Sequence, residues 1–67
     1  MADARSFTNA EKYEAAKREV KMRRRVYPQW TQRGKMSEEE SEWQIAVMES
    51  IMLDYQRADI ADRTILI

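Results

Sequence analysis

The chain has 67 residues and contains neither cysteine nor histidine. This composition excludes disulfides, thiolate metal sites and histidine-based proton transfer, and the length allows one small domain. Charged residues make up 36% of the sequence and balance to a net charge of zero, while glycine and proline occur once each. Few turn residues and many helix formers favour an all-α fold. A core this small predicts marginal stability, which a partner or a second copy would raise.

The charges are distributed unevenly along the chain. Residues 17–35 contain eight bases and one acid, whereas residues 36–67 contain eight acids and two bases. No apolar run approaches the ~20 residues of a membrane span, and the first residues lack the apolar core of a signal peptide. We therefore expect a soluble, cytoplasmic protein that does not contact a membrane.

A flexible segment over residues 1–7 and a helix over 8–26 are predicted at the N-terminus. Thr8 and Glu11 have the spacing of a capping box, in which each satisfies an amide at the start of a helix. One face of this helix collects Tyr13, Ala16, Val20, Tyr27 and Trp30. Arg23 lies in the same stripe, where we expect its stem to pack and its guanidinium to reach water.

Pro28 predicts that this helix ends near Val26 or kinks there, because proline lacks an amide hydrogen and disfavours helical backbone before it. We assign residues 27–36 to a kinked connector, with the alternative that Pro28 begins one short helical turn. Gly34 supplies a helix stop. Trp30 and Trp43 flank the connector, and they either clamp the two helices together or remain exposed as interface anchors.

Ser37 begins a second helix, predicted over residues 37–57. Glu40 completes a second capping box, and the acids at 38–40 lie at the positive end of the helix dipole. The main apolar face of this helix contains Ile45, Val47, Met48, Ile51, Met52 and Tyr55, and the other side contains Trp43, Ala46 and Leu53. Residues 58–67 are predicted to be an apolar tail that packs back on the helices. We identify no sustained heptad repeat.

These elements predict an all-α, antiparallel two-helix hairpin with a kinked Pro/Gly connector, completed by dimerisation. The second helix has more apolar surface than one neighbouring helix can cover, which predicts a homodimer or another protein partner. The candidate protein interface is the aromatic and methionine face, formed by Tyr27, Trp30, Trp43, Met48, Met52 and Tyr55.

Nucleic-acid binding is the alternative function. Its candidate contacts are Lys17, Lys21, Arg24 and Arg25, since basic side chains bind phosphates and nearby aromatic rings stack on bases. Two observations count against it: the whole chain is neutral, and the arginines at 24 and 25 are placed to pair with acids of the second helix. We therefore favour a protein-interaction role.

No catalytic set is recognisable in the sequence. The serines have no partner base at a known spacing, and helix capping explains the acids at 38–42 without a metal ion. The methionines are interpreted as packing residues, although methionine-rich surfaces also bind proteins. We expect no enzyme activity, no cofactor, no metal and no small-molecule substrate.

A series of short motifs is spread over roughly residues 17–55, more than half of the chain. These are MRRRVYP at residues 22–28, Gly34-Lys35-Met36 in the connector, IAVME at 45–49 and Asp54-Tyr55. The pattern resembles a group of small proteins encoded in bacteriophages and prophages of proteobacteria. This resemblance implies an accessory protein in the cytoplasm of a bacterial host, and it assigns no activity and no functional residue.

Overall fold

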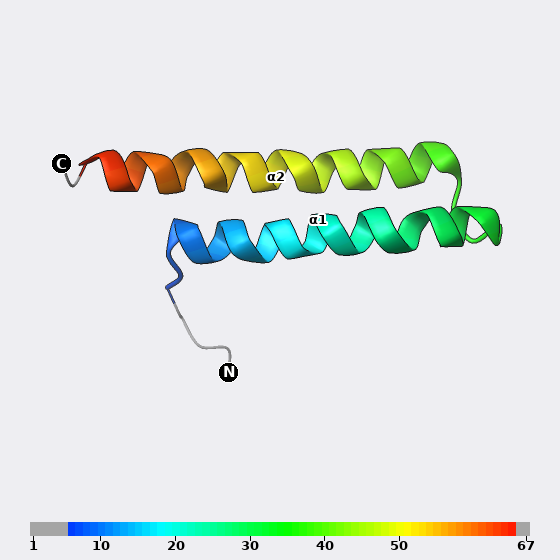
Figure 1. The fold of residues 1–67 in the computed structure, drawn as a ribbon. Coiled ribbons are helices and arrows are strands. Elements are labelled where there is room, and N and C mark those ends of the chain that lie inside the picture. Colours follow the sequence, from blue (N-terminus) through cyan, green and yellow to red (C-terminus); the bar gives the residue numbers. More distant parts are fainter. Residues whose placement is uncertain (1–5, 66–67) are drawn as a thin grey trace.

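A computed structural model describes residues 6–65 and shows two helices that lie side by side in opposite directions (Figure 1). Helix α1 is Asn9–Gln32 and helix α2 is Glu38–Ile65, and the two pack against each other. No strand occurs between residues 6 and 65. The predicted all-helical, two-helix fold is thereby confirmed. The expectations for residues 1–5 and 66–67 fall outside the described part of the chain.

The capping box predicted at Thr8 and Glu11 starts α1. The Glu11 amide donates to Thr8 Oγ1 at 3.1 Å, and the Thr8 amide donates to Glu11 Oε1 at 2.9 Å. The Thr8 hydroxyl also bonds to Glu11 Oε1 at 3.0 Å. The backbone hydrogen bond from Thr8, followed by that from its hydroxyl, lowers the pKa of Glu11 below 4.5, its ordinary value.

This lowered pKa predicts that the start of α1 loosens in acid. Because the folded-state pKa of Glu11 lies below the unfolded value of 4.5, the stabilising effect of its carboxylate is present above that pH and is lost as the pH falls through the folded-state pKa. A Glu11→Gln variant cannot titrate at this position. Acid titrations followed by circular dichroism should show a larger loss of helix in the parent, and superimposable curves would contradict the assignment.

Helix α1 continues six residues beyond the end that we predicted at residue 26. Pro28 lies inside the helix, and the expected connector over 27–36 is reduced to the residues between Gln32 and Glu38. Proline removes one helical hydrogen bond, the one to the carbonyl of Arg24, but the residues that follow still form a complete helical end. The Thr31 hydroxyl also donates to the Tyr27 carbonyl at 3.0 Å.

Gly34 ends α1 in a Schellman motif, which two backbone hydrogen bonds define. The Lys35 amide donates to the Trp30 carbonyl at 2.9 Å and the Gly34 amide donates to the Thr31 carbonyl at 3.1 Å. Gly34 has a φ of +73°, the left-handed conformation that glycine adopts without a steric penalty. Gly34 therefore acts as the helix stop that we predicted for it. Pro28 does not stop the helix.

A Gly34→Ala variant should lose about 1 kcal/mol of stability. A Cβ at this position would meet no atom within 4 Å, so the loss would come from the backbone conformation alone. Thermal unfolding of this variant, compared with Lys35→Ala next to it, measures the effect. An unchanged midpoint for Gly34→Ala would contradict the role of the left-handed turn.

Helix α2 starts as predicted and ends later than predicted. The Glu40 amide donates to Ser37 Oγ at 3.0 Å, whereas no reciprocal bond from the Glu40 side chain is found within residues 6–65. At the other end, the expected tail from residue 58 continues the helix as far as Ile65. Near this end, Asp62 Oδ2 accepts a hydrogen bond from the Asn9 side chain at 3.0 Å, which ties α2 to the first turn of α1.

The contact between the helices follows a heptad-like seam. Along α1 it contains Tyr13, Ala16, Val20, Arg23 and Tyr27, and along α2 it contains Ser41, Ile45, Met48, Met52, Tyr55 and Asp59; all are buried or half-buried. Spacings of three and four residues alternate throughout, as in an antiparallel coiled coil. This repeat is not apparent from the sequence because three of its positions hold polar residues, namely Arg23, Ser41 and Asp59.

Arg23 does not extend into water as expected. Its guanidinium donates to the Gln44 carbonyl of α2 at 2.7 Å and to Glu19 at 2.9 Å, and its side chain is 18% exposed. The group also lies 5.8 Å from the centre of the Tyr27 ring. A helical carbonyl has a second lone pair free, so this arginine can join the helices without breaking α2.

Candidate functional site

The six residues of the predicted interface do not form one surface. Tyr27, Met48, Met52 and Tyr55 are half-buried in the seam between α1 and α2, where Lys12 lies over the Tyr55 ring at 5.4 Å. Trp30 and Trp43 are 40% and 61% exposed. The seam therefore uses most of the methionine and aromatic face within the hairpin, and it leaves the two tryptophans at the surface.

The tryptophans do not clamp the helices together. Trp30 stacks on Tyr27 of its own helix, with ring centres 5.4 Å apart and an angle of 23° between the planes. Within the described residues Trp43 makes no aromatic pair and is the most exposed of the large apolar side chains. Of the two alternatives for Trp43, the exposed position is the one observed.

A stripe on the far side of α2 is the most unusual surface of the hairpin. It contains Trp43, Ala46, Ser50, Leu53, Arg57 and Ile60, which we call the outer stripe. Leu53 and Ile60 are 41% and 55% exposed, beside the 61% of Trp43. By contrast, Ala16 and Val20 are the sole buried apolar residues in the described range. Single exposed apolar residues are normal, whereas these three lie on the same side of one helix.

The outer stripe could have been found from the sequence by its spacing. From Trp43 to Ile60 the steps are three, four, three, four and three residues, so that all six positions lie on one side of a helix. The pattern is not apparent when only apolar residues are considered, because Ser50 and Arg57 are polar. Ile60 was missed because we assigned residues beyond 57 to a tail.

Three of the four candidate nucleic-acid contacts, Lys17, Lys21 and Arg25, lie along one flank of α1. Arg18 lies beside them, and we call these four residues the basic flank. Arg24 is partly neutralised because its guanidinium pairs with Glu49 of α2, and the Lys17 ammonium lies 5.8 Å from the centre of the Tyr13 ring. Among the described residues, Lys21 and Arg25 have no acidic partner within ion-pair distance.

The acids at the start of α2 lie beyond most of the basic flank. In the antiparallel arrangement Arg24 meets Glu49, so the basic flank lies beside the middle of α2. The acids Glu38–Glu42 lie near the end of α1 instead. At a rise of about 1.5 Å per residue, Arg25 at the near end of the flank lies about 4.5 Å along the axis before Pro28, which lines a groove together with Glu42.

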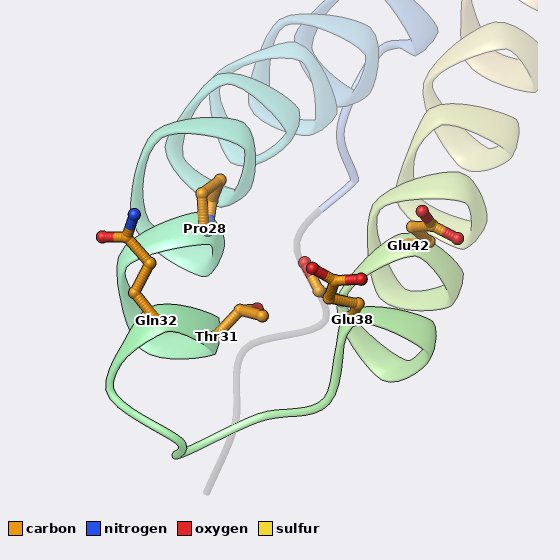
Figure 2. Close-up of a pocket in the computed structure, with 6 residues that line it drawn as sticks. Pro28, Thr31, Gln32, Glu38 and Glu42 are labelled. Atoms are coloured by element: carbon orange, nitrogen blue, oxygen red, sulfur yellow. The ribbon is translucent and has the colours of Figure 1, made fainter.

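A shallow groove of about 380 Å³ lies between the end of α1 and the start of α2 (Figure 2). It is lined by Pro28, Thr31, Gln32, Glu38, Ser41 and Glu42. Its open form and its two carboxylates offer no enclosed surface for a small molecule. Within the described residues, no three acidic side chains come close enough together to hold a metal ion.

The comparisons with known proteins give no family assignment. No family model, no curated protein and no solved structure matches the chain. Neither α1 nor α2, as far as the structure describes them, is long and apolar enough to cross a bilayer. The functional interpretation therefore rests on the outer stripe and the basic flank.

Proposed function

We propose that this chain is a non-enzymatic interaction module, a helical hairpin that binds protein through the outer stripe of α2. The observation that supports this role is the exposure of Trp43, Leu53 and Ile60 in one row. Burying each of these side chains in an interface gives about 1.5–3 kcal/mol, and tryptophan in particular is frequent among the residues that dominate binding. The half-buried methionines of the seam are left to stabilise the hairpin.

The resemblance of residues 17–55 to phage and prophage proteins supports a setting for this role. It favours an accessory protein in the cytoplasm of a bacterial host. The absence of histidine and cysteine from the sequence supports a role in binding instead of catalysis.

Leu53→Glu tests the role of the outer stripe. The change places a charge in the middle of the row, at a side chain that is already 41% exposed, so we expect the hairpin to remain folded. The parent and the variant are compared by light scattering and by recovery of bound proteins from a bacterial lysate. Gln29→Glu, an exposed position of α1 away from the stripe, is the matched control. Association that is equally strong in parent and Leu53→Glu, whether with itself or with other proteins, would contradict the proposal.

The basic flank supports nucleic-acid binding as a second candidate function. Lys21 and Arg25 are exposed, four residues apart and free of acidic partners in the described part of the chain, so they repel each other unless an anion lies between them. We expect a Lys21→Glu, Arg25→Glu double variant to lose binding to a labelled oligonucleotide. Each lost phosphate contact lowers the salt dependence of log K by about 0.9 for duplex DNA. A parent protein that does not bind at low salt would exclude this candidate.

A further inference from the structure

The outer stripe has the spacing of a second coiled-coil seam, on the opposite side of α2 from the seam that contacts α1. Its row runs from Trp43 to Ile60 in alternating steps of three and four residues. A single helix that carries two such rows packs against two neighbours. Helix α1 is the first neighbour, and the second is missing from a single hairpin.

We propose that the second neighbour is α2 of another copy of this chain, packed antiparallel. This inference rests on the proposed function and names the partner of the same stripe. The longest overlap of the two rows places Trp43 of each copy against Ile60 of the other. In that register the remaining layers pair Ala46 with Arg57 and Ser50 with Leu53. Each layer then combines a large side chain with one that is smaller or apolar, without a like-charge pair.

The charges beside the stripe select the antiparallel direction. One edge of the stripe is formed by Glu42, Glu49, Gln56 and Arg63, each seven residues from the next. Within the hairpin Glu49 pairs with Arg24, the Gln56 amide donates to the Tyr13 hydroxyl, and Arg63 pairs with Asp59 of its own helix while its side chain stays 74% exposed. In an antiparallel pair this edge meets itself, so Glu42 faces Arg63 of the other copy and, by symmetry, Arg63 faces Glu42. Glu49 meets the neutral Gln56.

A parallel pair would be disfavoured at one place. It would put Arg57 of one copy against Arg57 of the other. Like charges in direct contact across an interface are unfavourable. The sequence of charges along α2 therefore fits one orientation of a second copy.

The exposed area of the chain also leaves room for a second copy. The accessible surface is 5610 Å², whereas a compact folded monomer of 8.0 kDa exposes about 4,450 Å². A standard interface covers about 800 Å² on each partner. The excess over a compact monomer is larger than the area that one partner contributes to a standard interface.

The first test is the solution mass over a range of concentrations. The parent should have twice the chain mass of 8.0 kDa, and Leu53→Glu should have the chain mass itself while retaining its helical circular dichroism. Gln29→Glu should remain a dimer. A parent that is monomeric throughout would overturn this inference. The broader proposal of a protein-interaction module would still stand if a lysate protein bound the parent and was lost with Leu53→Glu.

A charge exchange tests the register. Glu42→Arg or Arg63→Glu alone creates two like-charge contacts and should weaken dimerisation about tenfold. The double variant should recover most of the parental affinity, although it still lacks the ion pair between Arg63 and Asp59 of its own helix. Because residues 42 and 63 are about 30 Å apart along one helix, such a recovery requires contact between copies. Single variants without any effect, or a double variant that is no better than either, would overturn the register.

Cysteine cross-linking tests the direction, since the natural chain has no cysteine. Ala46 and Arg57 are both exposed in the single hairpin. A mixture of Ala46→Cys and Arg57→Cys chains should form a disulfide under oxidation, whereas either variant alone should not, because identical positions lie about 16 Å apart in this register. Cross-linking of each variant with itself would indicate a parallel pair and overturn the proposal.

Discussion

Val20→Asp is expected to unfold the hairpin at room temperature. Val20 is 2% exposed at the centre of the seam, and Ala16 at 4% is the other buried apolar residue of the described chain. A carboxylate in this position either remains charged without a partner or takes up a proton, and both alternatives cost several kcal/mol. A chain of this length has a total stability of about 3–10 kcal/mol, so the loss is comparable to the whole.

Far-UV circular dichroism and thermal unfolding measure this effect. The matched control is Lys21→Asp, which introduces the same side chain one residue further along at an exposed position. We expect this control to retain the helical signal and to unfold close to the parental midpoint. A Val20→Asp variant with the parental midpoint would show that the seam does not hold the two helices together.

Arg23→Ala should destabilise the hairpin by about 1.5–3 kcal/mol, the range for a hydrogen bond to a charged group. The change removes the bond from the guanidinium to the Gln44 carbonyl and leaves a gap beside Tyr27. It also frees Glu19, which is partly exposed and can be hydrated. The loss therefore comes mainly from the contact between the helices.

Two further variants separate charge from geometry at this position. Arg23→Lys keeps the charge but lacks the planar group that reaches Gln44 and Glu19 together, so we expect it to recover part of the lost stability. Arg25→Ala, an exposed arginine of the same helix, should change stability by less than about 0.5 kcal/mol. Equal free energies of unfolding for Arg23→Ala and Arg25→Ala would contradict the role of Arg23 as a link between helices.

Local signals in the sequence indicated two helices and the start of each one, and the glycine at 34 marked a helix stop, although we predicted that the first helix ends at residue 26. Thr8 with Glu11, Ser37 with Glu40 and the single glycine at 34 act through hydrogen bonds and backbone preferences within a few residues. Such local signals can be recognised in the sequence without knowledge of the fold. The hairpin follows from them, because a short connector between two amphipathic helices brings their apolar sides together.

The residues that face inward are set by the packing of the two helices. Helix α2 carries apolar residues on two sides, and α1 covers one of them, so Met48 and Met52 enter the seam while Trp43 and Leu53 remain exposed. The same packing places Pro28 inside α1 and turns the supposed tail into the last turns of α2. It also turns Arg23 toward a carbonyl of the facing helix. These outcomes depend on contacts between residues that are far apart in the chain. Local sequence patterns do not predict such contacts.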